Sequence, residues 1–255
     1  MPPEQDPTRK PAPDWRGLPD FEKYDRLVEE MPDGWWDLRS PLGGLHALNR
    51  ARVAYFRDKL EGFAGKRILD VGCGGGIFAE SLADDDARVV GIDPSSASIR
   101  VAREHAASQN LPIDYRIGFA ERLGFEREFD AVFAVDVLEH VEDLTATLAA
   151  CSRALKPGGF FGFLTHNQTL EAFRFLIWEQ EYVERSMPKG AHDFHKFLTP
   201  EALSSALRGA GLNLLEVRGL SRAGRGESYE ISLSEDLSIS YLGFALRAEP
   251  SEGTG

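Results

Sequence analysis

One short segment of the chain carries the clearest chemical signal. Residues 70–76 read Asp-Val-Gly-Cys-Gly-Gly-Gly; the apolar pair Ile68 and Leu69 precedes them, and an apolar stretch over 77–83 follows. Glycine is favoured where the backbone needs a positive φ or where a ligand must touch the main chain. The segment therefore predicts a strand, a tight turn and a helix, with an acid beside a loop that can hold a ligand.

The spacing of these glycines narrows the kind of ligand. A dinucleotide fingerprint has a third glycine three residues after the second, where this chain has Ile77, and a phosphate-binding Walker loop needs a following Lys-Ser or Lys-Thr. The remaining pattern, with Asp70, Gly72, Gly74 and Gly76, resembles motif I of the class I S-adenosylmethionine-dependent methyltransferases. Adenosylmethionine has no phosphates, so it needs close backbone approach and carboxylates. The alternative is a glycine-rich turn without a ligand.

Further acids follow later apolar runs. Asp93 stands seventeen residues after Gly76, close to the spacing at which an acid holds ribose hydroxyls, and Pro94 then ends the strand. The run over 129–137 ends with Asp136 and Val137, and Glu139 and His140 follow it. Because open α/β sheets bind ligands at the carboxyl ends of their strands, we expect these side chains to surround one site.

The chain elements that would position these residues alternate regularly. Apolar strand patterns alternate with helical patterns, and the five expected strands cover residues 67–71, 88–92, 113–117, 129–137 and 160–164. This alternation predicts a Rossmann-like α/β fold with a parallel sheet and helices on both faces. After the third strand, Phe119 is expected to stack on a purine, with the adenine held by backbone groups of Ala120 and Glu121.

Two features precede this fold. A helix is expected over 45–63, with Arg52 on its apolar stripe, where a guanidinium needs an anionic partner. That partner is either a carboxylate of the fold or the carboxylate of the cofactor's methionine moiety. Trp35 and Trp36 stand outside any periodic element, and they serve either as a core plug or as a wall or lid of the site.

Composition limits the remaining possibilities. The chain has 255 residues, 42% of them hydrophobic, and a net charge of −12, which disfavours a nucleic-acid partner. Two cysteines suit a reducing compartment, and neither a signal peptide nor a membrane-spanning run is evident. We therefore expect a cytoplasmic protein whose methyl acceptor is a small molecule.

A narrower resemblance emerges from motifs spread in order along the chain. The chain resembles the UbiG-type O-methyltransferases of ubiquinone biosynthesis from about residue 34 to residue 246. The segments that carry this resemblance are Trp35-Trp36-Asp37-Leu38, Leu45-His46, Asn49 with Arg52, the glycine motif, Leu138-Glu139-His140-Val141, Lys156-Pro157-Gly158-Gly159, and Pro188-Lys189-Gly190-Ala191-His192-Asp193 with Lys196-Phe197.

The resemblance implies a set of site residues. The family's cofactor positions fall on Arg52, Gly72, Asp93 and Val135, the last through its main chain, and its divalent cation, such as Mg²⁺, would be held by Asp136, Glu139 and His140. Asp136 departs from the family's usual glutamate. The resemblance also implies a seven-stranded, mostly parallel sheet with an antiparallel C-terminal hairpin, formed by residues 212–217 and 239–247. It further implies peripheral membrane contact through residues 169–187.

These observations define the expected organisation and activity. Residues 1–33 form an N-terminal extension, with 1–19 expected to be disordered. Residues 34–249 form one methyltransferase domain, with a cofactor half over 45–165 and a substrate and lid half over 166–249, and residues 250–255 form a frayed tail.

We expect methylation of a phenolic or catechol hydroxyl, with His140 as the preferred general base and His192, beside Asp193 and His195, as the other candidate. Glu139 has an alternative role in capping a helix. Methylation of another small molecule, such as a natural-product phenol or an amine, and adenosylmethionine binding without catalysis are the competing functions.

Overall fold

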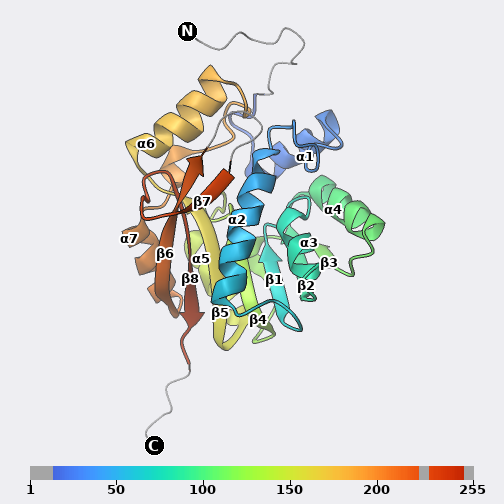
Figure 1. The fold of residues 1–255 in the computed structure, drawn as a ribbon, viewed down its shortest axis with the longest axis vertical. Helices are drawn as coiled ribbons and strands as arrows, with labels where there is room; N and C mark the ends of the chain where they lie inside the picture. Colours follow the sequence, from blue (N-terminus) through green and yellow to red (C-terminus); the bar gives the residue numbers. More distant parts are fainter. Residues whose placement is uncertain (1–13, 224–229, 250–255) are drawn as a thin grey trace, which may run out of the picture.

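A sheet of eight strands runs through the molecule in the order β3-β2-β1-β4-β5-β8-β6-β7 (Figure 1). The computed structural model describes residues 14–223 and 230–249. The strands are β1 (Arg67–Val71), β2 (Arg88–Asp93), β3 (Asp114–Ile117), β4 (Phe129–Val135), β5 (Leu155–His166), β6 (Leu212–Ala223), β7 (Glu230–Ser234) and β8 (Ser240–Arg247).

The first five strands are parallel, as the alternating pattern predicts. Helices cover both faces of the sheet (Figure 1), which is why these strands are apolar with few interruptions. The helical segments are α1 (Asp20–Glu30), α2 (Gly44–Lys59), α3 (Ile77–Ala83), α4 (Ser96–Ser108), η1 (Ala120–Arg122), α5 (Leu144–Ala154), α6 (Leu170–Ala172), η2 (Phe173–Val183), η3 (Phe194–Lys196) and α7 (Pro200–Gly209).

Two cores lie on opposite faces of the sheet. On β1, Ile68 packs with the residues of α2, α3 and α4, whereas its neighbour Leu69 packs with those of α5 and α7. This alternation follows from the two-residue period of a strand. The two cores fix the strands, and thereby the loops that leave their carboxyl ends.

The C-terminal part of the sheet is antiparallel. β8 pairs with β5 and with β6, as the expected hairpin requires. The expected count of seven strands was one too low, because β7 adds an eighth strand beside β6. β7 alternates polar and apolar residues over only five positions, and all five are exposed or partly exposed, so it lacks the buried apolar run that marks the parallel strands.

The N-terminal segment is ordered where the structure describes it. The expectation of disorder over 1–19 was wrong for residues 14–19, and its remainder lies outside the described residues, as does the expected tail over 250–255. The side chain of Trp15 is buried, and its backbone N–H donates to the carbonyl of Lys189 at 2.7 Å. The buried indole thus fixes residues 14–19, a tertiary contact that composition does not reveal.

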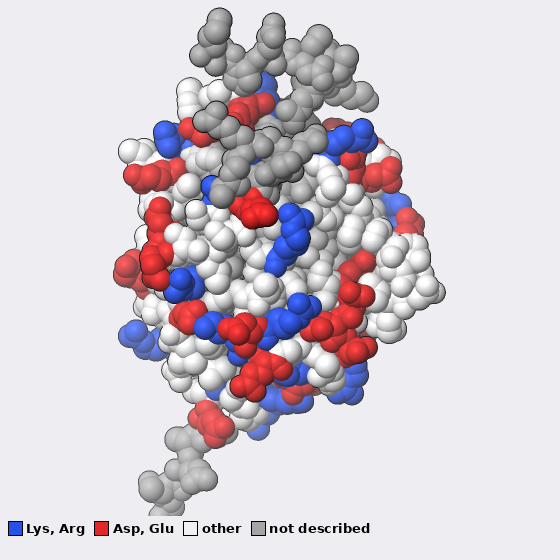
Figure 2. All heavy atoms as spheres, in the orientation of Figure 1, with Lys and Arg blue, Asp and Glu red and all other residues white. Residues whose placement is uncertain are grey.

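Charges of both signs are interspersed on the face shown in Figure 2. Ion pairs such as Arg57 with Asp85 and Lys59 with Glu216 are partly exposed. Solvent weakens such pairs, so they contribute little to stability. Among the described residues, no helix is long and apolar enough to cross a bilayer.

Candidate active site

A cavity of about 830 Å³ opens at the carboxyl ends of β1, β2 and β4. Its wall near β1 and β2 includes Asp70, Gly72, Gly74 and Asp93, and its far wall includes three histidines, His140, His166 and His192. A glycine loop and a histidine cluster therefore face the same space. This is the edge at which α/β sheets bind ligands.

The glycine loop takes the backbone conformation that the sequence predicts. Gly72, Gly74 and Gly76 have φ angles of 68°, 51° and 93°. A Cβ atom on Gly72 would lie 2.3 Å from a methyl carbon of Val137, and one on Gly74 would lie 2.3 Å from the ring of Trp35. Side chains at these positions are excluded both by conformation and by space.

Asp70 is fully buried at the base of the loop. Neither of its carboxylate oxygens has a hydrogen-bond partner among the described residues. Burial raises the pKa of Asp70 to about 7, although the charge of Arg52 and the nearby backbone N–H of Ala79, which is too poorly aligned for a full hydrogen bond, oppose this shift. A buried carboxylate without partners is costly, so its presence at a cavity wall indicates a cationic or hydrogen-bond-donating ligand.

Asp93 closes the loop from the neighbouring strand. It accepts hydrogen bonds from the backbone N–H groups of Gly74 at 2.9 Å and Ser95 at 2.8 Å. Burial raises the pKa of Asp93 to about 6, and these two hydrogen bonds lower it in part. The carboxylate is thereby fixed at the rim of the cavity, where its remaining lone pairs can accept hydrogen bonds from hydroxyl groups.

The two tryptophans pack on the glycine loop. The indole N–H of Trp35 donates to the Ser98 hydroxyl, and that of Trp36 donates to the Gly75 carbonyl, both at 3.1 Å. Trp35 also lines the cavity, while Trp36 stacks on the ring of His105. Trp35 therefore combines the two roles that the sequence left open, a buried plug and a wall of the site.

Arg52 is buried and pairs with Asp136. Its Nη1 lies 2.8 Å from Asp136 Oδ2, its Nε donates to Asn49, and its guanidinium lies over the ring of Phe78. The expected ion pair within the fold is therefore present. Arg52 also lines the cavity, so an anionic ligand group can approach it as well.

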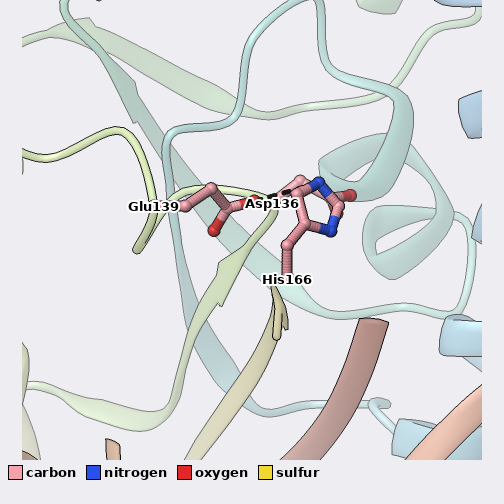
Figure 3. Close-up of side chains that lie close together, drawn as sticks. All are labelled: Asp136, Glu139 and His166. Atoms are coloured by element: carbon pink, nitrogen blue, oxygen red, sulfur yellow. Dashed lines mark ion pairs between the residues drawn. The ribbon is translucent and has the colours of Figure 1, made fainter. Parts of the chain in front are cut away.

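Asp136, Glu139 and His166 form the cluster of possible metal ligands (Figure 3). One ligand atom from each lies within 4.8 Å of the others. His140, the expected third member, is not part of this cluster, whose imidazole is that of His166 at the end of β5. The metal-ligand assignment of His140 stays a prediction. His166 Nε2 lies 3.6 Å from Glu139 Oε1.

The Glu139 carboxylate lies in this cluster and does not cap the helix that follows. Its Oε2 accepts from the Thr165 hydroxyl at 2.7 Å, while its buried Oε1 has no hydrogen-bond partner among the described residues. Burial raises the pKa of Glu139 to about 7. The helix that follows, α5, is capped instead by Asp143. Because a buried carboxylate oxygen is stable only beside a cation or a hydrogen-bond donor, the unpartnered Oε1 fits a bound cation.

His140 faces the N-terminal helix. Its Nδ1 lies 3.4 Å from Asp20 Oδ1, and Asp20 also pairs with Lys23 and Lys196. Burial lowers the pKa of His140, but the hydrogen bond to Asp20 and the charges of Glu139 and Asp20 outweigh it, so the net pKa is raised. Asp20 thus ties α1 to the far wall of the cavity.

His192 is the second candidate base, and it is held by an acid of η2. Its Nδ1 lies 3.1 Å from Glu181 Oε1, and its ring lies 5.4 Å from that of His166 between centroids. Asp193 and His195, expected beside it in an acid–base cluster, are exposed, and Asp193 caps η3. Of the three, only His192 is among the residues that line the cavity.

Most of the other expected cofactor residues also line the cavity: Pro94, Phe119, Ala120, Glu121 and Val135. Gly76 does not line it and instead begins α3. The Phe119 ring lies edge-on to that of Phe21 at 6.0 Å, and the Glu121 carboxylate accepts from the backbone of Glu142.

Sequence reasoning missed several residues of the cavity wall. Asp20, Phe21 and Tyr24 come from α1, which lies in the segment expected only as an N-terminal extension. His166 had a usable signal, since it directly follows an apolar strand at the carboxyl end of the sheet. Glu181 had no such signal in the sequence, because only the tertiary structure brings it next to the loop that carries His192.

The comparisons with known proteins identify relatives. A family model described as a methyltransferase domain matches residues 69–163. The ubiquinone biosynthesis O-methyltransferase of Hahella chejuensis is 40% identical over 224 residues, covering 87% of this chain and 93% of the relative. The protein of that name from Nitrosococcus oceani is 39% identical over 223 residues, covering 87% of this chain and 93% of the relative.

Solved structures share the fold. The magnesium protoporphyrin IX methyltransferase of Synechocystis, solved with bound SAH, aligns with a TM-score of 0.64 and 17% identity, covering 89% of this chain and 99% of that one. A possible histamine N-methyltransferase from Thermotoga maritima aligns with a TM-score of 0.61 and 17% identity, covering 89% and 99%. At these identities the likeness concerns the fold alone.

Proposed function

Because the chain belongs to the ubiquinone biosynthesis O-methyltransferase family, we propose that it methylates a phenolic hydroxyl of a quinone precursor. The chain is an S-adenosylmethionine-dependent methyltransferase. The observation that carries the proposal is that one cavity is lined both by a glycine loop with buried acids and by a cluster of histidines. The first half suits the methyl donor, and the second suits a hydroxyl that must lose its proton.

The donor would lie along the glycine loop. Asp93 would accept hydrogen bonds from the ribose hydroxyls, and Asp70 would face the methionine ammonium, since its oxygens have no partner within the described part of the chain. Arg52 would meet the methionine carboxylate, and Phe119, Ala120 and Glu121 would surround the adenine. The main chains of Gly72 and Val135 complete this half, as in the family pattern.

The reaction requires alignment and removal of one proton. The acceptor oxygen attacks the sulfonium methyl carbon, the bond from sulfur to that carbon breaks, and sulfur keeps the electron pair. The hydroxyl proton passes to a histidine, for which His140 and His192 are the two candidates in the cavity wall. The three histidines lie close enough to surround one hydroxyl, with ring centroids 5.4 to 6.4 Å apart for the pairs that include His192.

A divalent cation such as Mg²⁺ fits beside this position. Asp136, Glu139 and His166 would hold it, and the orphaned Oε1 of Glu139 supports that assignment. When bound, such an ion lowers the pKa of a coordinated hydroxyl. Asp136 would then be shared between the ion and Arg52, its present partner.

An exposed apolar face supports access for a lipid-tailed acceptor. On α6 and η2, five large hydrophobic side chains are exposed: Leu170, Phe173, Trp178, Tyr182 and Val183. We propose that this face rests on the cytoplasmic surface of a membrane. The two free cysteines, both buried, suit the reducing conditions of the cytoplasm. Trp178→Ser should lower cosedimentation with lipid vesicles, and equal binding of the two proteins would contradict this placement.

The test is transfer of a radiolabelled methyl group from adenosylmethionine to a prenylated catechol presented in vesicles. A short soluble catechol and an aromatic amine serve as competing acceptors. Methylation of the amine in preference to both catechols would overturn the assignment to a hydroxyl. His140→Ala and His192→Ala, each with SAH binding measured separately, then show which histidine the chemistry needs.

A further inference from the structure

Glu181 is a buried acid on η2 whose partners all lie in the loop that follows. Its side chain is 1% exposed. Its two oxygens accept from the backbone N–H of Gly190 at 2.7 Å and the backbone N–H of His192 at 3.0 Å, and Oε1 also lies 3.1 Å from His192 Nδ1. The carboxylate therefore fixes both the path of the loop and the orientation of one imidazole.

This contact determines where the proton of His192 resides. An ionised carboxylate only accepts hydrogen bonds, so the ring nitrogen that faces it, Nδ1, must carry a proton. In a neutral imidazole the other nitrogen, Nε2, then has a free lone pair. No hydrogen bond to Nε2 is formed within the described part of the chain, and His192 lines the cavity.

The alternative histidine lacks such a dedicated partner. Asp20, the acid beside His140, also pairs with Lys23 and with Lys196, and its distance to His140 Nδ1 is longer, at 3.4 Å. Within the part of the chain that the structure describes, Glu181, in contrast, contacts His192 and the backbone N–H of Gly190. The local structure around Glu181 thus serves one imidazole.

We propose that Glu181 is a positioning residue for methyl transfer, which holds His192 with Nδ1 protonated and Nε2 ready to accept the proton of the acceptor hydroxyl. This inference rests on the proposed function. In the step, the hydroxyl proton moves to Nε2 while the oxygen takes the methyl group from the sulfonium. The imidazolium that forms is stabilised by the Glu181 carboxylate and later returns the proton to water.

The helix η2 carries Glu181 on its inner side and aromatic side chains on its outer side. Glu181 lies between Trp178 and Tyr182 on η2, and those two aromatic side chains are exposed while Glu181 points inward. The element has the wide hydrogen-bonding pattern of a π-helix, a rare conformation that is frequently found at functional sites. The same eleven residues therefore present an apolar outer face and an inner carboxylate that holds His192.

The kinetic test is a double-mutant cycle of Glu181→Gln and His192→Ala, with 4-methylcatechol and radiolabelled adenosylmethionine. Glutamine keeps the size of the side chain, but its amide no longer compels a proton on Nδ1. We expect kcat to fall about 100-fold in Glu181→Gln with little change in KM for the methyl donor. In the His192→Ala background, the same substitution should change kcat less than about twofold, because its target is absent.

The matched control is Glu184→Gln on the same helix end, where the side chain is exposed. It should retain the kcat of the parent protein. SAH affinity, measured by calorimetry for every variant, reports whether the fold is kept. If Glu181→Gln lowers kcat equally with and without His192, its role is structural and the proposal is overturned.

The spectroscopic test needs no variant of Glu181 to fold. Nitrogen-15 NMR of the intact protein, with His192 assigned by comparison with His192→Ala, reports which ring nitrogen carries the proton. We expect protonated Nδ1 and unprotonated Nε2, and the reverse tautomer would refute the proposal. If the parent protein methylates no catechol, the proposed function fails, whereas the tautomer still tests the Glu181 contact independently.

Discussion

Replacing Asp70 by asparagine should change stability and cofactor affinity in opposite directions. The substitution keeps the shape of the side chain but removes a negative charge that is fully buried and has no hydrogen-bond partner within residues 14–223 and 230–249. Without ligand, that charge is a cost to the fold. With adenosylmethionine bound, the same charge would face an ammonium group.

The size of the stability effect follows from the raised pKa. Burial raises the pKa of Asp70 from 3.8 to about 7. Between these values the folded state binds more protons than the unfolded state, so the contribution of Asp70 to the free energy of unfolding is lost as pH rises through this window. From pH 5 to pH 8 the loss is roughly 2 to 3 kcal/mol, at 1.36 kcal/mol for each pKa unit.

The assay is urea unfolding of Asp70→Asn and the parent protein at pH 5, 6, 7 and 8, without cofactor. The advantage of the variant should grow by that roughly 2 to 3 kcal/mol from pH 5 to pH 8, with most of the rise complete near pH 7. Calorimetry at pH 8 should show SAH binding weakened by roughly 10- to 100-fold, from the loss of one charged hydrogen bond.

A matched control is Asp130→Asn on β4, the neighbouring strand. Burial acts to raise the pKa of Asp130, but the hydrogen bonds from Lys156 and from the backbone of Arg67, together with nearby positive charges, outweigh it, and the net pKa is lowered. This substitution should therefore not stabilise the protein at high pH. SAH affinity should be unchanged. A stability difference for Asp70→Asn that does not vary with pH, or an unaltered SAH affinity, would refute the account of Asp70.

Three further substitutions test other parts of the site. Gly74→Ala places a Cβ 2.3 Å from the Trp35 ring at a φ of 51°, so we expect SAH affinity to fall at least about tenfold by calorimetry. Asp20→Ala removes the carboxylate that raises the pKa of His140, so an NMR titration should show that pKa lowered; an unchanged value would contradict the pairing. His166→Ala should weaken Mn²⁺ binding by about 10-fold or more in calorimetry with SAH present, whereas His140→Ala should not; the opposite ranking would restore His140 as the ligand.

The strand-end acids were predictable because their positions depend on local order along the chain. Asp70 and Asp93 directly follow apolar runs, and the carboxyl ends of parallel strands meet at one edge. The glycine pattern likewise predicted a turn with positive φ angles, and the angles of Gly72 and Gly74 agree. These features need only the period of a strand and the steric freedom of glycine.

The orientation of side chains across the cavity was not predictable in the same way. His166 is the last residue of β5 and His140 lies in the loop after β4, but His166 turns toward Glu139 while His140 turns toward Asp20. That choice depends on α1, whose packing is fixed by Trp15 through contacts far apart in the sequence. Such contacts arise from packing and not from local propensity.

The sequence by itself therefore determined the parallel sheet, the glycine loop and the edge at which the acids gather, because strand period and backbone sterics are local. Only the tertiary structure decided which imidazole joins Asp136 and Glu139, and which acid holds His192. Those pairings are made between segments brought together by burial of apolar surface. The spacing of residues along the chain does not encode them.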